Sequence, residues 1–203
     1  MTLDRLRPVA DRLLEPFVAL SNRLGLTPDA VSVLAFVLAG GAGTTFYLGG
    51  TDPTWYLAGT VLVFLNGWLD LLDGALAREL GTESRAGDLL DHMLDRYADI
   101  VIIAGLAAGV GRYALGFAAM TGVLLTSYLG TQAQAVGLDR VYGGLLGRAD
   151  RLALVGVTGV LAAFVPATPA GLSVVGWLLA VFAVVGHFTA LQRFYFAWRA
   201  LAE

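Results

Sequence analysis

Three long stretches of this chain contain no charged residue, and this feature limits its fold more than any other. They are Ala30–Gly50, Tyr113–Leu138 and Leu152–Gly186. An apolar run of about 18 residues or more is long enough to cross a bilayer as a helix. The charged fraction is 14%, well below the roughly 25% of a typical soluble domain. The sequence therefore predicts an all-α integral membrane protein with a single domain over residues 1–203.

Turn and capping residues divide the chain into helices. We predict six transmembrane helices, at about residues 28–49, 53–79, 84–110, 112–137, 150–166 and 169–202. Three helix starts carry a capping residue followed by proline, which is favoured in the first helical turn: Thr27-Pro28, Asp52-Pro53 and Thr168-Pro169.

Residues 1–25 precede the predicted six-helix bundle of residues 28–202 and differ from it in composition. They mix leucine, valine and phenylalanine with arginine and aspartate. This pattern is typical of an amphipathic helix that lies in the membrane interface.

The arginines indicate how the chain is oriented. All 13 basic residues are arginine, and in the six-helix arrangement only Arg112 falls on one side of the membrane. Cytoplasmic loops carry an excess of positive charge. We therefore expect a plasma-membrane protein with both termini in the cytoplasm and with the polar residues of segment 70–95 facing it. The net charge of −3, without a basic tract, argues against nucleic acid as a partner.

Four aspartates lie where the second and third predicted helices meet. Asp70 and Asp73 share one face of the second helix, and Asp91 and Asp95 share one face of the third. Because the linker Glu79–Ser84 is short, we expect the two helices to be antiparallel neighbours and the two pairs to converge. Carboxylates at membrane depth are costly, and their default interpretation is functional.

These carboxylates predict a divalent-metal site. Oxygen ligands suit hard cations such as Mg²⁺ or Mn²⁺. Four ionised aspartates would repel one another, and two divalent ions would balance their charge. A pair of metal ions can hold the attacking and leaving oxygens of a phosphoryl displacement. Asp88 and Asp99 extend the stripe on the third helix, and the sequence assigns neither of them a role.

Small residues and an arginine accompany the aspartates. Gly74, Ala77 and Gly87 would keep the helix faces thin, so that a ligand can approach. Arg78 is suited to pair with a phosphate. Taken singly, Gly74, Ala77 and Gly87 would most often serve close helix packing, and Arg78 would most often be a membrane anchor.

Two features of the later helices suggest packing. Gly105-x3-Gly109 would form a packing face in the third helix. His187 has no second metal ligand near it in the sequence, which favours a hydrogen-bonded packing role.

The string Asp70-x2-Asp73-Gly74-x2-Ala77-Arg78-x8-Gly87-x3-Asp91-x3-Asp95 resembles the signature of the CDP-alcohol phosphatidyltransferase family at every position. The resemblance implies a dimerising six-helix bundle with a polar cavity open to the cytoplasm. It implies that the four aspartates hold the metal ions and that Asp91 and Asp95 are catalytic, with Asp95 as general base. Four further residues would line the site of the CDP moiety: Gly74, Ala77, Arg78 and Gly87.

The reaction implied by this resemblance belongs to phospholipid synthesis. A carboxylate takes a proton from an alcohol, the alcohol attacks the β-phosphorus of a CDP-linked lipid, and CMP leaves. Positioning and charge stabilisation do most of the work in such transfers. The donor would be a diacyl lipid or an archaeal ether lipid.

Five segments resemble the branch of the family that makes phosphoinositol-type lipids: Gly81–Arg85, Leu90–Asp99, Ser127-Tyr128, Arg148–Leu152 and Leu191–Arg193. By resemblance, Arg148, Arg151 and Arg193 would bind the phosphate of an inositol phosphate acceptor. The chain departs from that branch at Gly130–Gln134, where two basic residues of the branch are missing. Glycerol phosphate, serine or another polar alcohol therefore stay open as acceptors, and the three arginines are explained equally well as membrane anchors.

Two other classes of protein remain as alternatives. A cation transporter would use the aspartates as its ion path, but it predicts carboxylates spread through the depth of the membrane. Here they gather at one end beside arginines, which favours a phosphate site. A non-catalytic membrane protein that binds lipid or nucleotide would need the same pocket without turnover.

Overall fold

The computed structural model describes residues 7–139, 146–166 and 169–202, and within these ranges it contains helices and no strands. The elements are α1 (Arg7–Arg23), α2 (Pro28–Leu48), α3 (Trp55–Leu80), α4 (Arg85–Gly109), α5 (Tyr113–Ala135), α6 (Arg148–Phe164), the short 3-10 turn η2 (Pro169–Gly171) and α7 (Val174–Ala202). The prediction of an all-helical chain is confirmed. Four helices are long and apolar enough to cross a membrane: α2, α3, α5 and α7.

The predicted helix starts have mixed outcomes. Thr27 caps α2, where its hydroxyl accepts a hydrogen bond from the N–H of Ala30 at 3.2 Å. The start predicted at Pro53 is wrong, because Asp52 instead accepts bonds from the N–H and hydroxyl of Thr54 and α3 begins after that turn. These bonds hold the pKa of Asp52 below its ordinary value.

The start predicted for the last helix is also wrong. Pro169 opens the 3-10 turn η2 rather than a long helix, and α7 begins at Val174. The predicted cap, Thr168, lies outside the described residues. Ala170 within η2 has a positive φ of 54°, which an α-helix does not accommodate.

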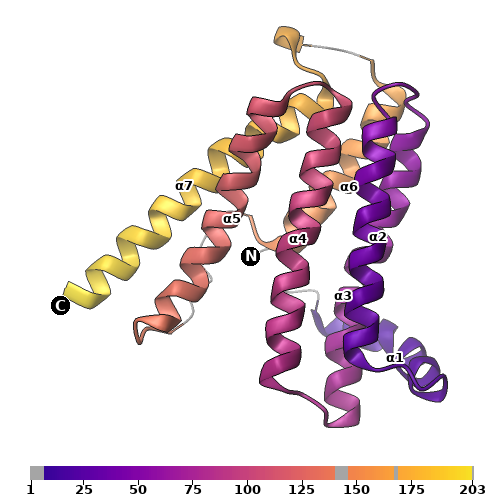
Figure 1. The fold of residues 1–203 in the computed structure, drawn as a ribbon, viewed down its shortest axis with the longest axis vertical. Coiled ribbons are helices and arrows are strands. Elements are labelled where there is room, and N and C mark those ends of the chain that lie inside the picture. The colour runs from indigo at the N-terminus through magenta and orange to yellow at the C-terminus, as the bar shows by residue number, and fades with distance from the viewer. Residues whose placement is uncertain (1–6, 140–145, 167–168, 203) are drawn as a thin grey trace.

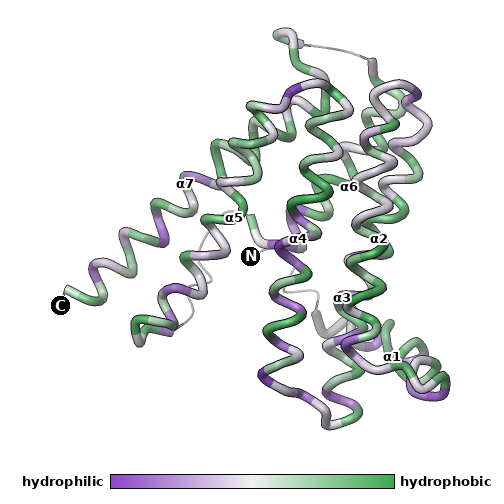
Figure 2. The backbone as a smooth tube through the Cα atoms, in the orientation of Figure 1, coloured by the Kyte–Doolittle hydropathy of each residue, from purple (hydrophilic) through white to green (hydrophobic). Residues whose placement is uncertain are grey.

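The helices form two neighbouring groups (Figure 1). α2 packs against both α3 and α4, and α6 packs against α3. α5 runs beside α7 over much of its length, and α4 contacts α5. Phe46, Ile102, Leu106, Leu179 and Phe182 are among the fully buried side chains of the core between them. Figure 2 shows hydrophobic residues along most of α2 and a run of hydrophilic positions in the N-terminal part of α4.

α3 and α4 are joined by a short turn but are not packed along each other. Gly81 ends α3 with a positive φ of 60°, and Ser84 caps α4 by accepting a bond from the N–H of Gly87 at 3.0 Å. Both helices instead lie against α2. The expectation of direct antiparallel neighbours is wrong to that extent, and the space between α3 and α4 is where their carboxylates meet.

α1 crosses the end of the bundle and contacts α3 (Figure 1). Leu14 is fully buried in a small cluster with Val31, Leu72 and Leu76. The rings of Phe17 and Trp68 meet edge to face with 5.3 Å between their centroids. α1 therefore supports the part of α3 that carries Asp70 and Asp73.

Glycines bring α2 and α4 into backbone contact. A Cβ atom at Gly105 would lie 2.0 Å from the carbonyl oxygen of Gly43, and one at Gly109 would lie 2.5 Å from that of Phe46. The predicted packing face at Gly105 and Gly109 is confirmed.

Replacing Gly105 by alanine is expected to destabilise the protein by about 1–3 kcal/mol, because α2 and α4 must move apart. Thermal unfolding in detergent, followed by tryptophan fluorescence, measures the effect. Gly40→Ala is the matched control, since a Cβ at Gly40 would meet nothing within 4 Å. Equal unfolding midpoints for the two variants would contradict the backbone contact.

Candidate active site

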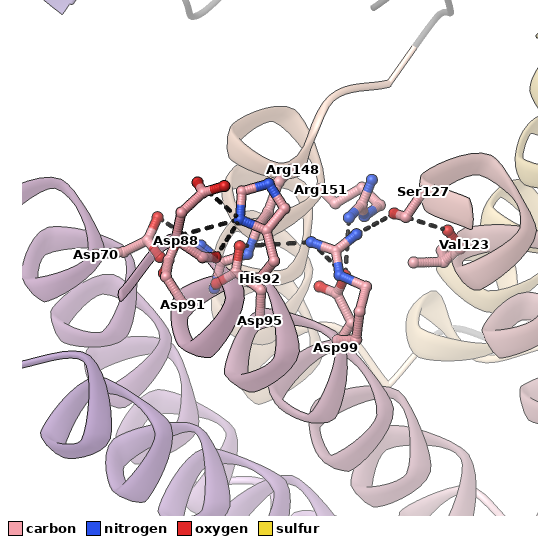
Figure 3. Close-up of polar contacts among 11 residues, drawn as sticks. Asp70, Asp88, Asp91, His92, Asp95, Asp99, Val123, Ser127, Arg148 and Arg151 are labelled. Carbon is pink, nitrogen blue, oxygen red and sulfur yellow. Dashed lines mark hydrogen bonds and ion pairs between the residues drawn. The ribbon is translucent and has the colours of Figure 1, made fainter. Parts of the chain in front are cut away.

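Three of the predicted metal ligands converge. Oxygen atoms of Asp70 on α3 and of Asp91 and Asp95 on α4 all lie within 4.8 Å of one another. Each of the three residues is partly buried. Figure 3 shows the carboxylates of both helices facing the same region. Hard oxygen donors at this spacing fit a divalent cation such as Mg²⁺ or Mn²⁺.

Asp73 stands beside this group in a more enclosed place. It is buried, and its Oδ2 accepts a hydrogen bond of 2.6 Å from the hydroxyl of Ser32 on α2. The converging set found among the described residues does not include Asp73. The sequence analysis missed Ser32, because nothing in the sequence indicated that α2 faces Asp73.

Arg148, at the start of α6, reaches into the carboxylate group. Its guanidinium lies 2.5 Å from an oxygen of Asp70 and 2.7 Å from an oxygen of Asp95. The guanidinium thus offsets part of the negative charge of the cluster. The arginine predicted to bind an acceptor phosphate is therefore placed among the carboxylates.

A second ion-pair network continues from Asp95 along α4 (Figure 3). Asp99 is buried and pairs with the buried Arg151 of α6 at 2.8 Å. Arg96 lies 3.4 Å from Asp95 and 3.9 Å from Asp99, and it also donates to the hydroxyl of Ser127 on α5. The sequence left Asp99 without a role, and the structure places it in an ion-pair network that connects α4 with α6 through Arg151 and with α5 through Arg96.

Arg193 is the third arginine predicted for the acceptor. It is buried on α7, and it donates to the carbonyl oxygen of Thr126 on α5 at 2.6 Å. Arg151 and Thr126 of α5 line a small pocket that is also lined by residues of α7. The structure thus places Arg151 and Arg193 around the same stretch of α5.

The residues predicted for the CDP moiety lie at the ends of α3 and α4. Gly74 and Ala77 are partly exposed and Arg78 is exposed in the last turns of α3. A Cβ atom at Gly74 would be 3.5 Å from the guanidinium of Arg78. Gly87 lies in the first turn of α4, and a Cβ there would be 3.3 Å from the carboxylate of Asp29.

The two histidines differ in their position relative to the carboxylate group, and His92 borders it, with its Nδ1 3.8 Å from a carboxylate oxygen of Asp91. His92 lies 2.8 Å from the carbonyl oxygen of Asp88, whose own side chain is 76% exposed. His187 lies 3.3 Å from the hydroxyl of Thr121 on α5, which agrees with the expected hydrogen-bonded packing role.

Comparison with known proteins identifies relatives over nearly the whole chain. The profile of the family described as CDP-alcohol phosphatidyltransferase matches residues 25–185. An archaetidylinositol phosphate synthase from Methanothermobacter thermautotrophicus is 29% identical, over 98% of this chain and 95% of its own. A phosphatidylinositol phosphate synthase from Streptomyces avermitilis is 35% identical, over 95% of this chain and 80% of its own.

Solved structures agree with this match. The crystal structure of Mycobacterium tuberculosis phosphatidylinositol phosphate synthase with CDP-DAG bound aligns with a TM-score of 0.79 at 28% identity, covering 92% of this chain and 94% of that one. A second crystal structure of that enzyme, in complex with manganese and citrate, aligns with the same TM-score at 29% identity, over 91% of this chain and 88% of that one. The chain therefore belongs to the CDP-alcohol phosphatidyltransferase family, and it is a metal-dependent transferase of phospholipid synthesis.

Proposed function

We propose that this protein transfers a phosphatidyl-type group from a CDP-linked lipid to a phosphorylated polyol and releases CMP. The observation that carries the proposal is the convergence of Asp70, Asp91 and Asp95 next to the partly buried Arg148 of α6. Carboxylates would hold the cations that a pyrophosphate needs, and arginines recognise phosphate. Inositol phosphate is the proposed acceptor, supported by the names of the relatives.

The carboxylate group would hold the divalent ions. Asp70, Asp91 and Asp95 supply converging oxygens, and Asp73 would contribute from the neighbouring turn of α3 to a second ion. Bound divalent ions supply positive charge that stabilises the transferring phosphoryl group and the leaving CMP.

Asp95 would act on the acceptor. Its side chain is 15% exposed and adjoins Asp91 and Asp70. A partly buried carboxylate in this position is suited to accept the proton of the attacking hydroxyl. Asp91 would support the same step as a ligand of the metal ions and as a negative charge next to Asp95. Arg148, which pairs with Asp95, would orient that carboxylate.

The CDP moiety would lie over the ends of α3 and α4. Gly74, Ala77 and Gly87 carry little or no side chain there, and a nucleotide can therefore approach the backbone closely. Arg78 would pair with a phosphate oxygen.

The acceptor phosphate would lie between α5, α6 and α7. Arg151 and Arg193 approach this region from two helices, and Arg148 borders it from the start of α6. The segment Gly130–Gln134 of α5 adds no positive charge. Because the branch that uses inositol phosphate carries two basic residues here, their absence leaves glycerol phosphate as the second candidate acceptor. Serine and other alcohols follow as alternatives.

The membrane arrangement extends this proposal. α4 and α6 would complete a bundle of six spans with α2, α3, α5 and α7, and α1 would lie in the interface. Exposed Leu13, Phe17 and Leu20 of α1 support that placement. The site and both termini would face the cytoplasm of the plasma membrane. Two copies would form a homodimer.

CMP release from a CDP-linked lipid tests the reaction and the acceptor together. Purified protein with Mg²⁺ is expected to release CMP with inositol phosphate or glycerol phosphate, and EDTA is expected to abolish release because the carboxylates alone cannot stabilise the pyrophosphate. Excess Mn²⁺ should restore it. Reactions without an acceptor measure background hydrolysis. Release with serine alone would overturn the phosphorylated acceptor, and release that persists in EDTA would overturn the metal-dependent mechanism.

A further inference from the structure

Asn66 presents a buried oxygen next to the carboxylate group. It lies on α3 one turn before Asp70, and therefore on the same face of the helix. The residue is 1% exposed. Its Nδ2 donates to the carbonyl oxygen of Ala35 on α2 at 2.9 Å. Because a carbonyl oxygen can only accept, this bond fixes which end of the amide faces α2 and turns Oδ1 away from it.

The Oδ1 atom of Asn66 is buried and has no hydrogen-bond partner within the described chain. Leaving a buried acceptor unpaired is energetically unfavourable. Native proteins leave few such groups, and each one calls for a water, an ion or a ligand. Asn66 lines a small pocket together with Asp70, Asp91, Asp95 and Arg148.

The surroundings restrict what this oxygen can bind. The nearby carboxylates attract cations, and Arg148 is already engaged with Asp70 and Asp95. An amide oxygen is a neutral, hard donor of the kind found beside carboxylates in divalent-metal sites. It adds a ligand atom without adding to the negative charge that Asp70, Asp91 and Asp95 already concentrate.

We propose that Asn66 Oδ1 is an additional, neutral oxygen ligand of the divalent ion at Asp70, Asp91 and Asp95, either directly or through one metal-bound water. This inference rests on the proposed metal site. Asn66 would also connect that site to α2 through Ala35, and α2 carries Ser32, the partner of Asp73.

Mn²⁺ titration of the purified full-length protein, followed by electron paramagnetic resonance, tests this role without turnover. Asn66→Ala is expected to weaken Mn²⁺ binding about 10-fold, as loss of a supporting ligand does elsewhere. Asn66→Asp restores an oxygen and is expected to bind within about 3-fold of the wild type or more tightly. Thr189→Ala is the matched control, because it removes another fully buried, unpartnered oxygen that lines a different cavity. It should leave Mn²⁺ affinity unchanged.

Asp91→Asn separates the two ways in which the idea can fail. If Asp91→Asn weakens Mn²⁺ binding while Asn66→Ala binds like the wild type and only unfolds at a lower temperature, Asn66 is merely structural and the inference is overturned. If Asp91→Asn also leaves the affinity unchanged, the metal site itself is misplaced and both proposals fail. Should Asn66→Ala not fold, weak Mn²⁺ binding by a folded Asn66→Asp would overturn the inference equally.

Discussion

Replacing Asp95 by asparagine is expected to reduce CMP release by about 10³-fold or more. General-base catalysis alone contributes about 10²- to 10⁴-fold, and Asp95 is also placed as a ligand of the metal ions. Asparagine keeps the size of the side chain but removes its negative charge and its basicity. Initial rates of CMP release at saturating Mg²⁺ and acceptor measure the loss.

Asp88→Asn is the control for this substitution. It makes the same chemical change two turns away on α4, at a side chain that is 76% exposed, and it should keep most of the activity. CDP-lipid binding should survive in Asp95→Asn, since the other carboxylates remain. Turnover within ten-fold of the wild type would show that Asp95 neither holds the metal nor takes the proton.

Removing the buried partner of Arg151 is expected to have the largest effect on stability. Asp99→Leu leaves the guanidinium of Arg151 buried without the carboxylate that lies 2.8 Å away. Breaking a buried ion pair in this way costs about 3–5 kcal/mol. Arg151→Met should cost a similar amount, because Asp99 then loses its closest partner.

The double variant Asp99→Leu/Arg151→Met distinguishes charge from shape. Replacing both members of a buried pair by apolar side chains is often close to neutral, so we expect most of the lost stability to return. Thermal unfolding of the four proteins in the same detergent gives the coupling between the two sites. A double variant as unstable as Asp99→Leu alone would contradict the interpretation that the unpaired buried charge causes the loss of stability. The double variant should also require a higher acceptor concentration for its half-maximal rate, because it lacks Arg151.

The sequence predicted the parts of this site that depend on local spacing. Asp70, Asp91 and Asp95 converge as expected, because Asp91 and Asp95, at i, i+4, share a helix face and a short turn joins the two helices. Asp73 was expected in the same group, and it pairs with Ser32 instead. The helix cap at Thr27 was likewise predicted from the dipeptide Thr27-Pro28 alone. The helix starts predicted at Pro53 and Pro169 failed because proline after a polar residue also begins short turns.

What the sequence could not supply is the choice of neighbours between distant helices. The contacts of Ser32 and Asn66 follow from the packing of α2 against both α3 and α4, which the sequence does not predict. Arg148 was expected near an acceptor phosphate, and the structure places its guanidinium between Asp70 and Asp95. Such contacts are set by side-chain packing over large sequence separations, which the periodicity of a single helix does not encode.

The position of Arg148 has a consequence for how this protein is made. The aspartates that it pairs with lie in α3 and α4, whereas Arg148 lies in α6, which follows them in the chain after α5. A growing polypeptide would therefore present Asp70 and Asp95 to the insertion machinery well before their cationic partner is synthesised. Until α6 arrives, water must solvate these carboxylates.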